Sequence, residues 1–289
     1  MKTKYAGYMG KIMAARILCD HLTGKETAFS EENWVVISTG PLTGTGAPSS
    51  ARFNISALSP QTGILASSNC GGSFGFHLKK AGYDALILKG KCRGRKWLEI
   101  SEDSFLFHDA DALWGTKVSE CQEQLAKRTG KTKFGKLCIG PAGENLVKYA
   151  GIISDERAAG RTGLGAVLGW KGLKAITATG SKTVPIHDKE KTTQWCKKWF
   201  AYLQGHPLTG SQLPKVGTAG LVSSMQMRGL LRIESGIKEK QCEAATMRDV
   251  LERLAVCGID RRDLNGCVIL INGNSASNGA NGKTAIRWC

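Results

Sequence analysis

The segment 155–174 combines residue types that could bind an anion. Its first part, 155–165, contains two arginines and three glycines: Arg157, Gly160, Arg161, Gly163 and Gly165. Glycines lack the Cβ that would keep a ligand off the backbone, so peptide N–H groups here can face a phosphate, and the guanidinium groups add forked donors. We therefore predict an anion site. A glycine-rich turn with solvated arginines would leave the same pattern, because glycine clusters are weak motifs.

Short strands and helices would have to position this site. The apolar run from Leu164 predicts a short helix whose N-terminal N–H groups would add positive charge beside the arginines. Residues 136–140 and 148–153 have strand character and bracket a Gly-Pro-Ala-Gly-Glu-Asn loop. We expect the second of these strands to lead the chain into the site.

An earlier part of the chain repeats this design. Residues 34–38 predict a buried strand that enters the glycine- and proline-rich stretch 40–48. Arg52 then opens an alternating run, which makes it a second candidate for anion binding. Small polar residues dominate 67–73, where they either leave room for a large flat ligand or allow a tight packing crossover.

Helical periodicity and glycine stops predict helices over 9–22, 76–80, 114–130 and 192–203. Residues 83–90 and 96–101 predict a hairpin. Its connection is strongly basic and includes Lys89, Lys91, Arg93, Arg95 and Lys96. A surface that reads nucleic acid would interleave aromatic residues for stacking, and only Trp97 lies near in sequence. We therefore predict a solvated basic hairpin.

Composition limits the classes of function. The formal net charge of +16, from 40 Lys+Arg against 24 Asp+Glu, predicts attraction to a nucleic acid, a phosphorylated cofactor or an acidic partner. The 10 cysteines are scattered along 289 residues, so we expect reduced thiols and a cytoplasmic protein. No apolar stretch approaches about 18 residues, which predicts a soluble protein without a membrane contact.

Six ordered blocks carry a resemblance to a known family. They are G-P-L-T-G-T-G-A-P (40–48), R-F-N (52–54), N-C-G-G-S-F-G (69–75), A-G-Y-D-A (81–85), I-G-P-A-G-E-N-L-V (139–147) and R-A-A-G-R-T-G-L-G-A-V-L-G (157–169). Over roughly residues 5–231 the chain resembles the tungsten-dependent aldehyde ferredoxin oxidoreductases. The resemblance implies an α+β fold, with two β-sheets forming a saddle-like N-terminal domain, a few flanking helices and then a partial helical segment. It places this domain at 1–185, the start of the helical second domain at 186–231 and a divergent tail at 232–289.

The resemblance also implies a cofactor and its contacts. Members of this family bind tungsten or molybdenum through two pterin dithiolenes (tungstopterin, or bis-molybdopterin), and a magnesium ion joins the pterin phosphates. By motif position, the residues expected to contact the cofactor are Arg52, Asn69, Gly71, Arg157, Ala158, Gly160 and Arg161. The backbone carbonyls of Asn69 and Ala158 are expected on the magnesium side. Since pterin sulfurs ligate the metal, Cys70 is expected to be a small packing residue. No catalytic residue is predicted.

Family members oxidise aldehydes to carboxylic acids and pass electrons through a [4Fe-4S] cluster to ferredoxin. The present sequence departs from them in lacking the first strand pair and the C-x-x-C-x-x-x-C cluster motif; the later cysteines are widely spaced, at Cys242, Cys257, Cys267 and Cys289. Residues 268–289 form an Asn/Gly/Ser-rich run, which indicates either a frameshifted end or a natural short form. We expect the chain alone to be inactive.

Partners remain open at this level. The helix over 192–203 either faces a missing partner domain or is an ordinary core helix. The expected partners are a separate C-terminal chain or a second copy in a homodimer. If active, the protein would use ferredoxin or another iron-sulfur carrier. The alternative function is that of a non-catalytic basic protein that binds nucleic acid or an acidic partner. The six blocks favour the oxidoreductase family and make nucleic acid the weaker expectation.

Overall fold

The structure, a computed structural model, describes residues 5, 7–221, 225, 227–228, 269–271 and 286–288. The chain divides into two compact units, residues 1–196 and 197–289. The first unit contains two β-sheets with helices packed on them, so the predicted α+β class is confirmed. The domain boundaries at 185 and 231 stay a prediction.

Sheet A has four antiparallel strands in the order β3-β2-β1-β4. The strands are β1 (Val35–Thr39), β2 (Phe53–Leu58), β3 (Leu65–Cys70) and β4 (Ala85–Leu88). Every residue of β1 is buried because this strand is central and covered on both faces. Its Val-Val-Ile run suits that position, since β-branched side chains pack well on a pleated surface.

Sheet B has six strands in the order β6-β5-β10-β7-β8-β9, in which only β10 and β5 are parallel. The strands are β5 (Lys96–Ile100), β6 (Phe105–Asp109), β7 (Gly135–Cys138), β8 (Ile152–Ser154), β9 (Arg157–Ala159) and β10 (Leu173–Ala178). Within the described residues, β3 forms one edge of sheet A and β9 one edge of sheet B. These two edge strands lie against each other.

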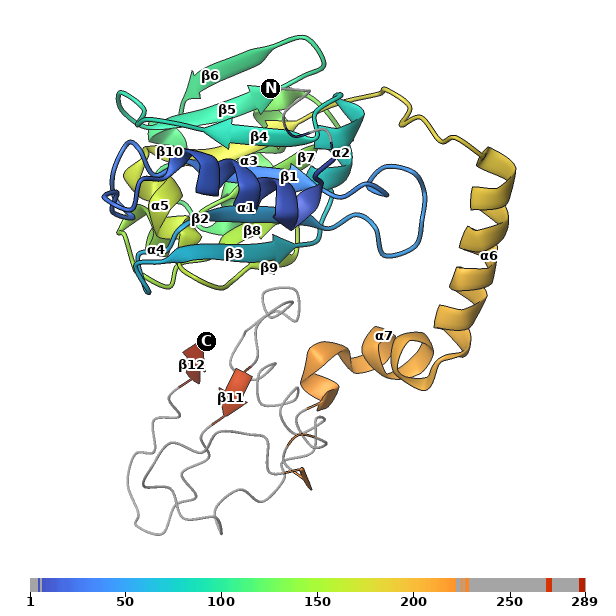
Figure 1. Ribbon diagram of the computed structural model, residues 1–289. Helices are drawn as coiled ribbons and strands as arrows, with labels where there is room; N and C mark the ends of the chain where they lie inside the picture. Colours follow the sequence, from blue (N-terminus) through green and yellow to red (C-terminus); the bar gives the residue numbers. More distant parts are fainter. Residues whose placement is uncertain are drawn as a thin grey trace, which may run out of the picture. The chain divides into compact units, whose positions relative to one another are not determined.

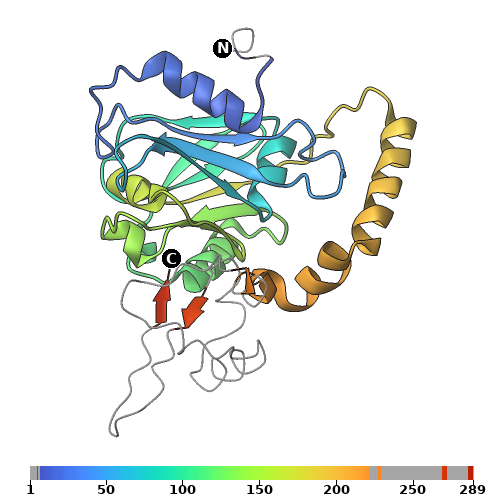
Figure 2. The same ribbon diagram turned by 60° about the horizontal axis from the view of Figure 1, so that its bottom comes forward.

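The first unit is layered. The main core lies between the two sheets, where Ile37 and Ile55 of sheet A meet Leu98 and Ile176 of sheet B. Helix α1 (Gly10–His21) covers the outer face of sheet A, as Figures 1 and 2 show. Helix α3 (Val118–Thr129) covers the other face of sheet B through Cys121 and Leu125. Strand residues therefore alternate between two cores.

Shorter helices complete the unit. They are α2 (Phe74–Lys80), η1 (Asp111–Leu113), α4 (Pro141–Glu144) and α5 (Leu164–Trp170). Helices α2 and α5 contribute Phe74, Leu78, Val167 and Leu168 to the core between the sheets. The second unit begins within a helix. It includes most of α6 (Lys189–Gly205), followed by η2 (Pro207–Gln212), α7 (Leu213–Val216), η3 (Gly217–Leu221) and the paired strands β11 (Ile269–Ile271) and β12 (Ile286–Trp288). Apart from these two strands, the predicted divergent tail at 232–289 lies outside the described residues.

Helix α6 contains no buried residue. Its aromatic side chains Trp199, Phe200 and Tyr202 are 49%, 55% and 61% exposed. The interpretation of residues 192–203 as an ordinary core helix is therefore wrong for the part of the chain that the structure describes.

The predicted hairpin of residues 83–90 and 96–101 is also wrong. Strand β4 pairs with β1 in sheet A, whereas β5 pairs with β6 and β10 in sheet B. The two strands are neighbours in sequence but belong to different layers. The strand predicted over 148–153 begins only at Ile152, because residues 147–150 form a turn closed by the bond from Ala150 N–H to Val147 O at 2.8 Å.

Candidate anion-binding site

Three separated segments of the chain meet where the edges of the two sheets adjoin. Arg52 lies immediately before β2, Asn69 lies in β3 and Gly71 follows it. Arg157 and Ala158 lie in β9, and Gly160 and Arg161 follow that strand. Since β3 and β9 lie side by side, the seven residues predicted from the sequence come from neighbouring elements.

Two contacts bring these segments together. A Cβ placed on Gly71 would be 3.2 Å from Cγ of Arg157, so the glycine lets the arginine side chain cross the backbone closely. The second contact is electrostatic and involves the buried thiol of Cys70. Burial raises its pKa to about 11, and the charges of Arg52 and Arg157 oppose that rise. Two arginines far apart in sequence thus lie near one point, and Cys70 is the packing residue that the sequence predicted.

Asp155 fixes the relation between the two edges. Its Oδ2 accepts a hydrogen bond from Ser73 N–H at 2.5 Å, and its backbone carbonyl accepts one from Gln122 Nε2 at 3.0 Å. Lys136 Nζ is 3.7 Å from Asp155 Oδ1. Asp155 has a φ of 52°, a left-handed conformation that aspartate tolerates better than most residues. No role was predicted for Asp155 from the sequence, although it lies only two residues before Arg157.

The described residues leave the guanidinium groups of the site without a carboxylate partner. Arg52, Arg157 and Arg161 are exposed, and no carboxylate forms an ion pair with them among the residues that the structure describes. Two of these guanidinium groups, those of Arg52 and Arg157, lie near Cys70, and such groups provide bidentate donors for phosphate or carboxylate groups. The site can therefore bind an anion with more than one negative charge.

The glycines of the segment 155–174 differ in exposure and in what lies opposite them. At Gly160, which is exposed, a Cβ would meet only the Cβ of Ala158 at 3.7 Å, so a ligand can approach the backbone there. At Gly163 a Cβ would be 1.8 Å from the carbonyl oxygen of Lys148, and at Gly165 it would be 2.3 Å from that of Gly151. Gly163 and Gly165 are buried packing glycines, and their predicted role at a phosphate is wrong.

The predicted contribution of the α5 N-terminus is wrong for the same reason. Gly165 N–H donates to the carbonyl oxygen of Ala150 at 2.9 Å, and Ala166 N–H donates to that of Gly163 at 3.0 Å. Every residue of α5 except Trp170 is buried. These amides are used inside the protein and do not face a ligand.

The side chain of Asn69 is held in place by its neighbour on β2. Asn54 Nδ2 donates to Asn69 Oδ1 at 2.8 Å and to Ser67 Oγ at 2.7 Å, and Ser56 Oγ donates to Asn54 Oδ1 at 2.7 Å. Asn54 is buried, so the network orients Asn69 rigidly. Asn54 was not singled out as a functional residue, although it closes the Arg-Phe-Asn block.

The basic residues of the loop between β4 and β5 are exposed, as predicted, but the structure places tryptophans beside them that the sequence did not indicate. Lys89 Nζ lies 3.6 Å from the ring centre of Trp34, Lys91 Nζ lies 4.6 Å from that of Trp170, and the guanidinium of Arg95 lies 5.2 Å from the ring centre of Trp114. The three tryptophans come from distant parts of the sequence, so a window around the loop could not find them.

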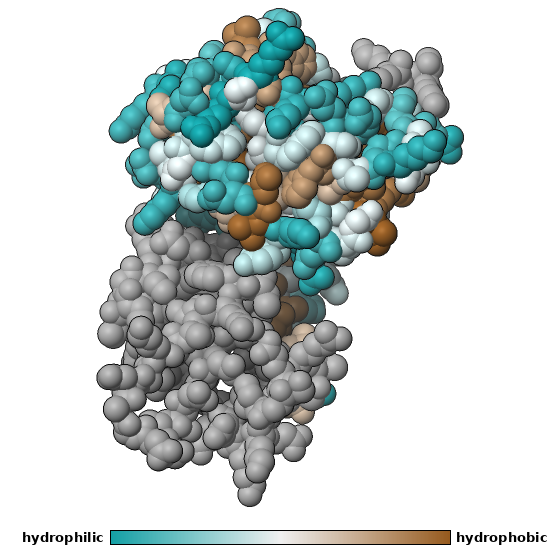
Figure 3. Space-filling view, turned by 90° about the vertical axis from the view of Figure 1, so that its left-hand side faces the viewer, coloured by the Kyte–Doolittle hydropathy of each residue, from teal (hydrophilic) through white to brown (hydrophobic). Residues whose placement is uncertain are grey.

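Figure 3 shows a mainly hydrophilic face with separate hydrophobic patches.

Other features bear on metal binding and location. The described free cysteines are Cys19, Cys70, Cys92, Cys121, Cys138 and Cys196. Within the described ranges, no group of three or more His, Cys, Asp or Glu side chains could hold a metal ion. In the same ranges, no helix is long and apolar enough to cross a membrane.

The chain is similar in sequence to known proteins. Residues 1–180 match the family model of the aldehyde ferredoxin oxidoreductase N-terminal domain. The tungsten-containing aldehyde ferredoxin oxidoreductase of Pyrococcus furiosus is 43% identical over 233 residues, which are 80% of this chain and 38% of that protein. The protein of the same description from Thermococcus kodakarensis is 43% identical over 228 residues, 78% of this chain and 37% of that protein. The chain thus spans less than two fifths of the length of these relatives.

A solved structure is similar as well. It is the active site complex BamBC of benzoyl coenzyme A reductase in complex with 1,5-dienoyl-CoA, with a TM-score of 0.66 and 36% sequence identity. The match covers 68% of this chain and 30% of that one.

Proposed function

The chain belongs to the aldehyde ferredoxin oxidoreductase family, and from this we propose that its first unit binds the phosphate-bearing part of a tungsten or molybdenum bis-pterin cofactor. The observation that carries the proposal is that the two sheet edges lie against each other. Strands β3 and β9 bring Asn69 and Gly71 beside the segment 157–161. Relatives named as tungsten-containing aldehyde ferredoxin oxidoreductases support the choice of cofactor.

The residues present fit a phosphorylated cofactor. Arg52, Arg157 and Arg161 are exposed and form no ion pair with a carboxylate in the described structure, so their donors are available to phosphate oxygens. Gly160 leaves its backbone open, and Gly71 lets Arg157 lie across the chain. In this assignment the arginines neutralise the phosphates and the two glycines set how closely the phosphates approach.

Asn69 and Ala158 are the proposed carbonyl donors to a magnesium ion between the phosphates. Each lies on a strand with one unpaired edge in the described sheets, and such an edge presents a row of backbone carbonyls. Oxygen donors of this kind suit a hard divalent cation, which commonly keeps phosphates among its ligands. The Asn54 amide, bonded to Asn69, would hold that part of β3 in position.

Tungsten or molybdenum would be held by the pterin sulfurs, and the metal would supply the oxidation of an aldehyde to a carboxylic acid. We propose that these 289 residues alone bind the cofactor without turning over substrate. The C-x-x-C-x-x-x-C motif for a [4Fe-4S] cluster is absent from the sequence. Electron transfer to ferredoxin or another iron-sulfur carrier would then use a cluster held outside these 289 residues, in the cytoplasm.

The anion site is tested by titrating the full chain with inorganic pyrophosphate in a calorimeter. We expect saturable binding that weakens at high salt, and a loss of roughly tenfold or more in affinity for Arg157→Ala and for Arg161→Ala. Arg93→Ala, which removes an exposed arginine from the loop between β4 and β5, is the matched control and should bind as the unmodified chain does. Equal affinities for all four proteins would contradict the assignment.

A further inference from the structure

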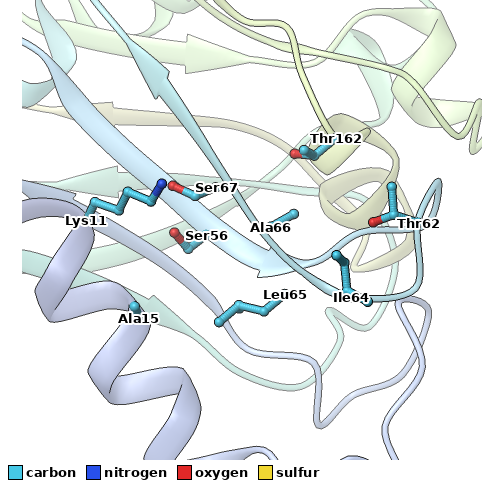
Figure 4. Close-up of a pocket in the computed structure, with 9 residues that line it drawn as sticks. All are labelled: Lys11, Ala15, Ser56, Thr62, Ile64, Leu65, Ala66, Ser67 and Thr162. Atoms are coloured by element: carbon cyan, nitrogen blue, oxygen red, sulfur yellow. The ribbon is translucent and has the colours of Figure 1, made fainter.

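A pocket of about 340 Å³ opens on the outer face of sheet A, between α1 and the β2–β3 hairpin (Figure 4). Ser56 and Ser67 are register partners on β2 and β3, and they share this face with Val36, which packs against α1. Thr162 also lines the pocket. The volume is roughly ten times the 30 Å³ that one water occupies in the liquid, so the pocket has room for an organic molecule.

A cation stands at one side of this pocket. Lys11 is exposed, and in Figure 4 its side chain extends from α1 toward Ser67 and Ser56. No carboxylate pairs with Lys11 within the described residues, and none lines the pocket. The charge is therefore available to a ligand.

Asn54 orients the two serine hydroxyl groups of the pocket. Because Asn54 Nδ2 donates to Ser67 Oγ at 2.7 Å, the Ser67 hydroxyl proton is left for another acceptor. Ser56 uses its proton on Asn54 Oδ1 at 2.7 Å, and Thr162 uses its own on the carbonyl oxygen of Arg161 at 2.5 Å. Ser67 thus supplies a donor beside the ammonium group, and the pair suits one anionic group.

The remaining wall is mainly apolar. Ala15, Ile64, Leu65 and Ala66 line it together with Thr62, and Ile64 and Leu65 are 67% and 37% exposed. Covering such side chains with an apolar ligand is favourable in proportion to the area removed from water. A cation beside the Ser67 hydroxyl donor at one side and mainly aliphatic side chains at the other describe a site for an amphiphilic monoanion.

We propose that this pocket binds a monocarboxylate with a short apolar chain, whose carboxylate contacts Lys11 and Ser67 and whose chain lies on Ile64 and Leu65. The site uses none of the arginines assigned to the cofactor phosphates and does not rest on the proposed function. A doubly charged ion without an apolar part would leave the aliphatic wall uncovered, so inorganic phosphate should bind less well than a fatty acid anion.

The test is a calorimetric titration of the full chain with hexanoate, 1-hexanol and inorganic phosphate. We expect hexanoate to bind at least tenfold more tightly than either of the others. Lys11→Met should lower the hexanoate affinity at least tenfold, Lys11→Arg should restore most of it, and Lys25→Met, at an exposed lysine after α1, should change nothing. Ile64→Ser should weaken hexanoate without strengthening phosphate.

Three results would overturn the proposal. The first is the absence of saturable hexanoate binding up to about 10 mM, a limit chosen because small ligands bind weakly. The second is equal hexanoate affinity in the unmodified chain and Lys11→Met. The third is Lys11-dependent phosphate binding as tight as that of hexanoate. Far-ultraviolet circular dichroism of each variant separates a lost site from a lost fold.

Discussion

Asp155 Oδ2 accepts the hydrogen bond of Ser73 N–H at 2.5 Å, joining residues 82 positions apart in sequence. The bond connects the loop after β3, an edge strand of sheet A, to the turn that leads from β8 into β9, an edge strand of sheet B. The two halves of the candidate anion site therefore depend on one carboxylate that itself faces no ligand in our assignment.

Removing this carboxylate should loosen the site. We expect Asp155→Ala to lower the free energy of unfolding by about 1–3 kcal/mol, since a charge-assisted bond to a backbone amide and a tolerated left-handed conformation are both lost. Pyrophosphate affinity should fall as well, and Asp155→Asn, which keeps an acceptor and tolerates the same φ, should recover most of both. Urea denaturation and calorimetry measure the two quantities. Asp103→Ala, at an exposed aspartate, is the control; a variant at Asp155 as stable and as tightly binding as the control would refute this role.

Two glycines only three positions apart should respond differently to a methyl group. Gly163→Ala puts a Cβ 1.8 Å from the Lys148 carbonyl oxygen at a φ of 72°, so we expect a loss of more than about 3 kcal/mol or no folded protein. Gly160→Ala meets only a contact at 3.7 Å and should fold normally while binding pyrophosphate more weakly. Thermal melts of both variants check the first statement and calorimetry the second. A stable Gly163→Ala protein would show that our description of the packing is wrong.

Lys171 should make stability depend on alkaline pH. It is 3% exposed, and its Nζ donates to the carbonyl oxygens of Gly90 at 2.8 Å and Glu31 at 3.3 Å. Burial lowers the pKa of Lys171 from 10.5 to about 8, while the Glu31 and Glu32 carboxylates oppose this shift. Between these two values the unfolded chain binds more protons than the folded one, so this lysine should add stability as pH rises.

The expected size of this effect is about 3 kcal/mol across the window from pH 8 to pH 10.5. The measurement is the difference in urea-unfolding free energy between the unmodified chain and Lys171→Met at several pH values, because the other lysines and tyrosines cancel in that difference. A difference that stays constant through the window would exclude the lowered pKa.

The exposed aromatic side chains of α6 should bind a hydrophobic dye. Trp199 and Phe200 are 49% and 55% exposed, and contiguous apolar surface of this kind promotes association. We expect the double change Trp199→Ser and Phe200→Ser to reduce anilinonaphthalene sulfonate fluorescence and aggregation with a stability change within about 0.5 kcal/mol. Leu106→Ser with Phe107→Ser, on exposed strand β6, is the matched comparison. If only the β6 pair lowers the signal, α6 is not the surface that binds the dye.

Local pattern predicted most of the elements, because each depends on neighbours in sequence. The buried run at residues 34–38 became β1, and the helical spacing at 9–22 became α1. The pairing of strands was harder, since β4 and β5 both have strand character and the sequence does not say which sheet each joins. The parallel partner of β5 is β10, which lies far along the chain.

The candidate site was likewise predictable only where it depends on local sequence. Motif position pointed to Arg52, Asn69 and the arginines of 157–161, and the structure brings their elements together. A glycine in the sequence does not reveal what lies opposite its missing Cβ, so Gly160 and Gly163 looked alike although only one is open. Likewise, Trp34 and Trp170 meet the basic loop only in three dimensions.

The cofactor proposal is tested most directly by the tungsten, molybdenum and pterin content of the purified 289-residue chain, produced in cells that make the cofactor. We predict metal and pterin in a fixed ratio, and loss of most of both when Arg52, Arg157 and Arg161 are all changed to alanine while the fold is kept. A folded chain that carries neither metal nor pterin, or that carries nucleic acid in their place, would contradict it.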